Sequence, residues 1–154
     1  MAPTSRALRM IAVIGAGSCD APTAERARAV GRLLVERGCA VVTGGLGGVM
    51  EAASRGAAQA GGLVVGLLPG PDPGAANAHV AVAIATGMGE ARNVMLANTA
   101  EAFVAIGGGH GTLSEIAFAL RREKRVVSLG SWEVDPAILV ARTAEEAVEL
   151  ALGR

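Results

Sequence analysis

The chain has 154 residues, of which 51% are hydrophobic and 2% aromatic, and its 14 basic residues balance 14 acidic ones. This length suits one domain that buries about two-thirds of its unfolded surface without disulfides or metal ions. Balanced charge excludes the broad electropositive surface that nucleic acids and anionic membranes require, which favours a small-molecule ligand. A core of aliphatic residues with 22 glycines favours a buried parallel sheet.

The first residues predict no targeting or membrane segment. Residues 1–8 are expected to be a disordered N-terminus, with a single domain over 9–154. The apolar run that follows is too short for a secretory signal or a membrane span, so we expect a cytoplasmic protein. Cys19 and Cys39 are too few and too far apart to bind a metal, which predicts reduced thiols and no metal site.

Strands and helices are predicted to alternate along the chain. Short apolar runs predict strands over 10–14, 40–43, 63–68, 80–85, 102–106 and 126–129. Amphipathic segments predict helices over 22–37, 49–60, 90–99, 112–122 and 143–152. This alternation is typical of an α/β fold, a Rossmann-like, doubly wound parallel sheet between two helical layers.

Glycine-rich turns follow three of the predicted strands. In a doubly wound sheet such turns lie along the carboxyl edge, and ligands bind where the strand order reverses. We therefore expect the turns near 15–20, 43–48, 69–79, 86–92 and 107–112 to face one cleft. The candidate ligand-binding residues on the glycine turns are Gly15, Gly17, Ser18, Gly44, Gly45, Gly47, Gly48, Gly108, Gly109, His110, Gly111 and Thr112.

The turn 107–112 carries the strongest functional signal. Glycines without Cβ let backbone N–H groups approach an anion, and a helix that begins near Thr112 adds its unpaired first-turn donors, so we expect a bound phosphate. Glu115 has two interpretations that the sequence leaves open. Thr112 and Glu115 have the spacing of a capping box, in which both are structural, and Glu115 also lies near the cleft, where it could take part in chemistry.

Several cofactor classes are disfavoured by the residues present. The turn at Gly15 lacks the third glycine of the dinucleotide fingerprint, and no acidic residue ends the second strand, which disfavours NAD. A P-loop motif is absent from the sequence. The only lysine, Lys124, precedes a strand away from the cleft, which disfavours a pyridoxal phosphate enzyme such as a lysine decarboxylase. Arg92 and Glu115 form the best candidate catalytic pair, because an arginine-held carboxylate can assist glycoside cleavage.

Three motifs together resemble one known superfamily. The segments 43–51, 92–93 and 107–115, in this order and size, look like those of the LOG-like Rossmann superfamily, formerly called lysine decarboxylase-like. The resemblance covers nearly the whole chain. The superfamily includes cytokinin riboside 5′-monophosphate phosphoribohydrolases and small molybdenum-cofactor carrier proteins.

This resemblance implies specific roles. Arg92 and Glu115 match the catalytic pair of the hydrolases, and Gly108, Gly109, Gly111 and Thr112 match their phosphate-binding turn. Two departures point to the shorter branch that contains the carriers: Gly107 stands where the hydrolases have proline, and Asn93 where they have lysine.

Two functions remain open at this stage. The first is binding of a phosphorylated, nucleotide-like molecule, with possible hydrolysis of a nucleoside 5′-monophosphate. The alternative is a non-catalytic carrier of the molybdenum cofactor, a pterin phosphate. No cofactor is required in either case, although the molybdenum cofactor is a candidate ligand. The resemblance also implies a homodimer or homotetramer, and no nucleic-acid or membrane partner. Val94, Met95 and Leu96 have two interpretations: they contribute apolar interface surface, or they form a broad core face of their helix.

Overall fold

The computed structural model describes residues 7–154, so most of the segment expected to be disordered lies outside the described residues. The chain forms one α/β domain with a seven-stranded sheet. Its strands are β1 (Arg9–Gly15), β2 (Cys39–Thr43), β3 (Val64–Leu68), β4 (Val82–Ala85), β5 (Ala102–Ile106), β6 (Arg125–Leu129) and β7 (Leu139–Val140). Its α-helices are α1 (Ala21–Glu36), α2 (Val49–Gln59), α3 (Arg92–Thr99), α4 (His110–Arg121) and α5 (Ala144–Ala151), and two 3₁₀ turns are η1 (Pro73–Ala75) and η2 (Gly89–Ala91).

The sheet is doubly wound, as the sequence predicts. Its strand order is β4-β3-β2-β1-β5-β6-β7, and every neighbouring pair is parallel. The order reverses between β1 and β5, which end side by side at the paired residues Gly15 and Ile106. The turns after these two strands therefore open a crevice at the carboxyl edge, the usual place for a ligand in this architecture.

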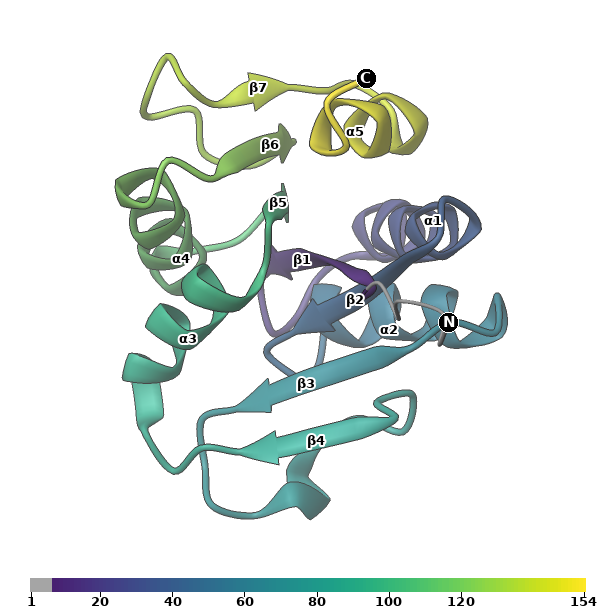
Figure 1. Ribbon diagram of the computed structural model, residues 1–154, viewed down its shortest axis with the longest axis vertical. Coiled ribbons are helices and arrows are strands. Elements are labelled where there is room, and N and C mark those ends of the chain that lie inside the picture. Colours follow the sequence, from purple (N-terminus) through teal and green to yellow (C-terminus); the bar gives the residue numbers. More distant parts are fainter. Residues whose placement is uncertain (1–6) are drawn as a thin grey trace, which may run out of the picture.

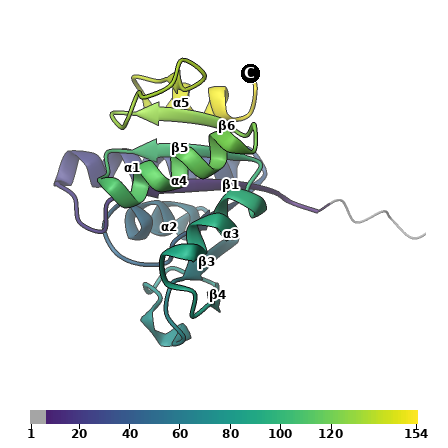
Figure 2. The ribbon, with the colours of Figure 1, turned by 90° about the vertical axis from the view of Figure 1, so that its left-hand side faces the viewer.

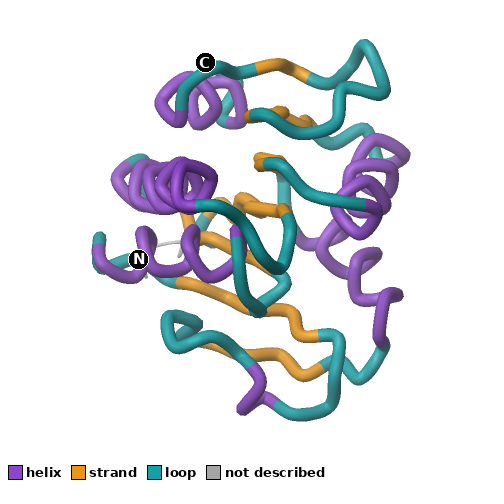
Figure 3. Tube along the Cα trace, turned by 180° about the vertical axis from the view of Figure 1, so that it is seen from behind, coloured by secondary structure: helices purple, strands orange, loops and turns teal. Residues whose placement is uncertain are grey.

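Helices cover both faces of the sheet (Figures 1 and 3). Helices α1, α2 and α5 pack on one face and α3 and α4 on the other, the face turned to the viewer in Figure 2. Successive residues of β1 alternate between the two cores, with Val13 in the first and Ile14 in the second. Because both faces are buried, the strands are continuous apolar runs rather than alternating ones.

The start of α4 differs from the sequence prediction. The helix begins at His110, two residues earlier than expected, and its N-cap residue is Gly109, which has no side chain to cap it. Thr112 therefore lies inside the first turn, and the predicted capping box of Thr112 and Glu115 is wrong. A side-chain cap does occur at α5, where Thr143 Oγ1 accepts a hydrogen bond from the Glu146 amide at 3.1 Å.

The remaining differences lie at segment ends. Strand β4 begins at Val82 rather than at residue 80, and the predicted helix over 90–99 is a 3₁₀ turn, η2, followed by α3. The two-residue strand β7 was not predicted, because it is too short to show periodicity.

The apolar residues of α3 mostly serve the core. Leu96 is fully buried, and Met95 is partly buried against the same cluster, so these two side chains form a core face, which was one of the two expectations for this helix. Exposed apolar side chains occur instead on the edge strand β4, where Val82 is 46% and Ile84 is 41% exposed. Their strand register places them beside Val65 and Leu67 on the α3 side of the sheet.

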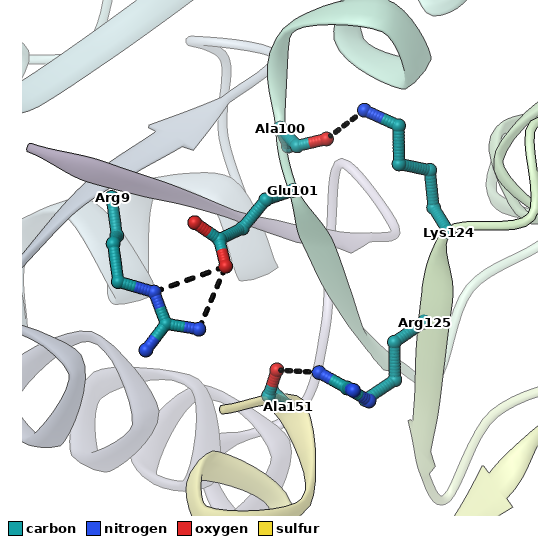
Figure 4. A network of polar contacts seen from close by, with 6 residues as sticks. All are labelled: Arg9, Ala100, Glu101, Lys124, Arg125 and Ala151. Atoms are coloured by element: carbon teal, nitrogen blue, oxygen red, sulfur yellow. Dashed lines mark hydrogen bonds and ion pairs between the residues drawn. The ribbon is translucent and has the colours of Figure 1, made fainter. Parts of the chain in front are cut away.

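The amino edge of the sheet carries structural polar contacts rather than a site (Figure 4). Lys124 Nζ donates to the Ala100 carbonyl oxygen at 2.7 Å, and Arg125 Nη1 donates to that of Ala151 at 3.1 Å. Arg9 and Glu101 form an ion pair at 2.7 Å. The only lysine of the chain is thus bound at the edge opposite the crevice, as the sequence predicts.

Residues 7–154 contain neither a membrane-spanning helix nor a cluster of metal ligands. No helix there is long and apolar enough to cross a membrane. No group of three or more His, Cys, Asp or Glu side chains in that range is arranged to hold a metal ion. Both cysteines are free thiols.

Candidate ligand-binding cleft

A cleft of about 560 Å³ opens at the carboxyl edge of the sheet, where the strand order reverses. This size lies within the range of pockets that bind small molecules. All five turns expected to face one cleft supply its walls, together with α2, α3 and α4. Its lining residues are Gly15, Ala16, Gly17, Leu46, Met50, Pro69, Gly89, Glu90, Arg92, Asn93, Gly109, Gly111, Thr112 and Glu115.

The structure divides the sequence-predicted site residues into two sets. Seven of them line the cleft: Gly15, Gly17, Arg92, Gly109, Gly111, Thr112 and Glu115. The others do not line it: Ser18, Gly44, Gly45, Gly47, Gly48, Gly108 and His110. His110 instead lines a smaller pocket beside the cleft. Packing against neighbouring atoms explains why the glycine positions of the second set carry no side chain.

Packed glycines hold the turns together. A Cβ on Gly48 would overlap the Ala16 carbonyl oxygen, and the positive φ of Gly48, 62°, is itself unfavourable for other residues. The next residue, Val49, donates its N–H to the same carbonyl at 3.0 Å. Gly108, with φ of 102°, lies so close to Thr112 that a side chain there would overlap the threonine hydroxyl. These positions need glycine whether or not a ligand binds.

Open glycines leave the floor of the cleft uncovered. A Cβ on Gly17, Gly109 or Gly111 would meet nothing within 4 Å, and none of the three has the positive φ that demands glycine. Local packing therefore does not explain why these three positions are glycine, and their backbone stays uncovered. Such exposed backbone is what a phosphate needs in order to approach main-chain N–H groups.

The N-terminus of α4 points into this open region. Its N-cap, Gly109, makes no side-chain hydrogen bond, and the first turn contains no acidic residue. The first N–H groups of an α-helix have no partner within the helix, and they carry the positive end of its dipole. The cleft thus combines uncapped amide donors with bare backbone, an arrangement suited to an anion.

Arg92 is anchored across the cleft by two backbone carbonyls. Its Nη1 donates to the carbonyl oxygens of Gly44, at 2.8 Å, and of Leu67, at 2.6 Å, so the side chain ties the turn after β2 to the end of β3. Its Nε is buried and has no hydrogen-bond partner. Burial lowers the pKa of this guanidinium, and the nearby charge of Glu115 opposes that shift.

Glu115 carries a carboxyl group that is partly protonated near neutral pH. Burial raises its pKa to about 7, although the positive charge of Arg92 acts in the opposite direction. Within residues 7–154 the two side chains form no direct ion pair, since Arg92 is committed to the two carbonyls and acts on Glu115 through space. A carboxyl that can be neutral at this pH repels a bound anion less than an ordinary glutamate would.

Asn93 also lines the cleft, although the sequence shows at this position only a departure from the hydrolase motif. It is 6% exposed, and its Nδ2 donates to Ser114 Oγ on α4 at 3.0 Å. Its Oδ1 is buried without a partner. The signal in the sequence was its place beside Arg92, but its partner, 21 residues along the chain, is brought near only by the fold.

His110 of the glycine turn pairs with an aromatic residue, Trp132, that the sequence did not single out. The rings of His110 and Trp132 are stacked, with centroids 6.4 Å apart and an interplanar angle of 23°. Trp132 Nε1 donates to the Gly109 carbonyl oxygen at 3.1 Å, and Ser131 Oγ donates to that of Gly107 at 2.5 Å. The loop after β6 therefore supports the turn after β5 from outside.

These features define a Rossmann-like, single-domain protein. Its cleft is suited to an anion and lies where the strand order of the sheet reverses. The chain belongs to the SLOG cluster4 family, whose model matches residues 8–152. This agrees with the superfamily resemblance found in the glycine motifs.

The chain is also similar to three individual proteins over nearly its whole length. An uncharacterized protein of Archaeoglobus fulgidus is 48% identical over 141 residues, which cover 92% of this chain and 93% of that protein. The molybdenum cofactor binding protein of Rippkaea orientalis has a similar structure, with a TM-score of 0.91 and 33% identity over 97% of this chain and 98% of that one. The Moco carrier protein of Chlamydomonas reinhardtii gives a TM-score of 0.85 and 32% identity, over 96% of this chain and 100% of that one.

Proposed function

We propose that the protein binds a phosphorylated pterin of the molybdenum-cofactor class in this cleft and carries it without chemical change. The observation that carries the proposal is the uncapped N-terminus of α4 beside the open glycines Gly109 and Gly111. Similarity over nearly the whole chain to proteins described as molybdenum cofactor binding and as a Moco carrier supports the choice of ligand class.

In this proposal the phosphate lies on the turn from Gly108 to Thr112. The first N–H groups of α4 donate to its oxygens, and the helix dipole favours its negative charge. Arg92 adds a fixed positive charge on the opposite wall, since its two carbonyl contacts prevent it from swinging away. Glu115, with a pKa near 7, is neutral often enough to tolerate the anion.

A second function has one observation in its favour. Glu115 and Arg92 line the same cleft, and a carboxyl with a raised pKa can donate a proton to a leaving base. This corresponds to hydrolysis of a nucleoside 5′-monophosphate to base and ribose 5-phosphate. We place it second, because carrier proteins are the described relatives that match the full length of the chain.

Thermal unfolding with added ligand tests the binding proposal. Inorganic phosphate, AMP and a pterin monophosphate are compared. A ligand that binds only the folded state stabilises it by about 2.7 kcal/mol at a hundredfold excess over Kd, and we expect the largest shift with the pterin. If no phosphorylated ligand raises the unfolding temperature, the proposal is wrong.

Chromatography separates the carrier from the hydrolase. Incubation with AMP and with cytokinin-type monophosphates is expected to release no free base. If the wild type releases free base and Glu115→Gln does not, the second function is established instead. The ligand-binding shift must be measured on the same samples, so that absence of turnover is not mistaken for absence of binding.

A further inference from the structure

A second, smaller pocket adjoins the cleft beyond Asn93. It has a volume of about 270 Å³ and is lined by Glu90, Asn93, His110, Gly111 and Ser114. Glu90, Asn93 and Gly111 line both spaces, so the side pocket begins where the proposed phosphate site ends. None of its polar side chains is needed for the anion site described above.

The polar groups of the side pocket include hydrogen-bond acceptors. Asn93 is 94% buried, and its amide is oriented by the bond from Nδ2 to Ser114 Oγ, which leaves the unpartnered Oδ1 as a hydrogen-bond acceptor. The Glu90 carboxylate is a second acceptor in the same lining. A buried acceptor without a partner is unfavourable, and a donor on a ligand would offset that cost.

One wall of the side pocket is a flat ring in a fixed orientation. His110 lines the pocket and stacks on Trp132, which is itself hydrogen-bonded to the Gly109 carbonyl oxygen. A planar heterocycle can pack against such a ring with little loss of side-chain freedom. Flat aromatic wall and hydrogen-bond acceptors together describe a subsite for an aromatic ring that bears N–H groups.

We propose that this side pocket, formed by Glu90, Asn93, His110, Gly111 and Ser114, binds the amino-substituted pyrimidine edge of the ligand. The ring packs beside His110, and the exocyclic amino group and the ring N–H donate to Asn93 Oδ1 and the Glu90 carboxylate. The inference rests on the proposed function, since it assigns the other end of the phosphorylated ligand. It makes Asn93 a specificity-determining residue.

Calorimetric titration with three probes tests this assignment. The probes are inorganic phosphate, a pterin monophosphate, and the matching lumazine monophosphate, in which oxygen replaces the 2-amino group. We expect the pterin to bind at least about tenfold more tightly than the lumazine, because a wrongly paired polar group in a closed site is costly. Equal affinity for the two rings would overturn the inference.

Asn93→Leu keeps the approximate size of the side chain and removes the acceptor. We expect it to abolish the preference for pterin over lumazine and to leave the affinity for inorganic phosphate within about twofold of the wild type. Asn98→Leu is the matched control on the same helix. Asn98 is exposed, accepts a hydrogen bond from Arg122 and lines neither space, so its variant should keep the full preference.

The outcomes separate the two proposals. If phosphate and both ring compounds fail to bind the wild type, the proposed function itself fails. If all three bind the wild type and Asn93→Leu lowers the affinity for each equally, the cleft binds its ligand but the side pocket does not distinguish one ring from the other. His110→Ala provides an independent check, since loss of the aromatic wall should weaken binding of the pterin at least about fivefold, and an unchanged affinity for the pterin would contradict packing against this ring.

Discussion

Arg92 Nη1 donates to the carbonyl oxygen of Gly44 at 2.8 Å, across 48 positions of sequence. A Cβ on Gly44 would overlap this same nitrogen and would come within 2.7 Å of Met50 Sδ. Gly44 does not line the cleft, although the sequence suggested that it binds the ligand. Its role is to leave room for the arginine that does line it.

Gly44→Ala is therefore expected to act through Arg92. Overpacking should lower the free energy of unfolding by about 1–3 kcal/mol, and the displaced guanidinium should weaken phosphate binding about tenfold. Urea unfolding and calorimetry measure the two effects. Gly70→Ala is the control, because a Cβ there meets nothing within 4 Å, and it should change neither quantity. An unaltered affinity in Gly44→Ala would mean that Arg92 does not contact the ligand.

Gly111→Ala should have opposite effects on stability and binding. Gly111 lies in the first turn of α4, where its Cβ would meet no atom within 4 Å. Alanine in a helix is about 0.5–1 kcal/mol better than glycine, so the free energy of unfolding should rise. The added methyl group should project into the open floor and reduce affinity for inorganic phosphate. A variant that gains stability and binds phosphate normally would move the anion away from this turn.

Thr112→Val tests the hydroxyl group inside the first turn of α4. Since Thr112 is not the N-cap, the free energy of unfolding should change by less than about 1 kcal/mol. Loss of a charge-assisted bond to the phosphate should raise Kd about ten- to a hundredfold.

The matched control for Thr112→Val is Thr143→Val. Thr143 caps α5, so its variant should lose about 1 kcal/mol of stability and bind phosphate as the wild type does. The two variants together separate a lost cap from a lost ligand contact. Normal phosphate affinity in Thr112→Val would show that this hydroxyl is only structural.

The raised pKa of Glu115 predicts how stability depends on pH. Its pKa in the folded protein, about 7, exceeds the ordinary glutamate pKa of 4.5, so the folded state binds more protons between these two pH values. The free energy of unfolding should therefore fall as pH rises from about 4.5 to about 7, and level off above that. The fall is on the order of 2–3 kcal/mol at most, because the side chain is only partly buried by surface area.

Glu115→Gln should remove this fall. Urea unfolding of both proteins between about pH 5 and about pH 8 measures it, as the difference between the two stability curves. That difference cancels the contributions of the other titrating groups. Parallel curves would show that the carboxyl titrates in the folded protein much as it does in the unfolded chain.

Self-association is expected through the exposed face of β4. Val82 and Ile84 form an apolar pair on the edge strand, and homodimer interfaces are enriched in such surface. Light scattering should give at least twice the monomer mass of 15.3 kDa, and Ile84→Lys should shift it toward the monomer. Val134→Lys, at a 59% exposed position in the loop before β7, is the control. A monomer mass for the wild type at micromolar concentration would contradict the expectation.

The sequence by itself determined the order of the helices and of every strand except β7, and the edge of the sheet at which the cleft lies. These follow from local patterns. Continuous apolar runs mark strands buried on both faces, and the glycines at 15–17, 44–48 and 107–111 mark turns that can only follow such strands. It also singled out Arg92 and Glu115, since both fall in segments that the topology brings to the same edge.

Only the tertiary structure decided what each of these residues does there. It placed Gly109 rather than Thr112 at the N-cap of α4, and separated glycines that pack, such as Gly44, from those that stay open, such as Gly111. It also gave Asn93 its partner Ser114 and an unpaired acceptor. These properties depend on distances between atoms far apart in the chain, and burial, hydrogen bonding and pKa values are set by those distances rather than by neighbouring residues.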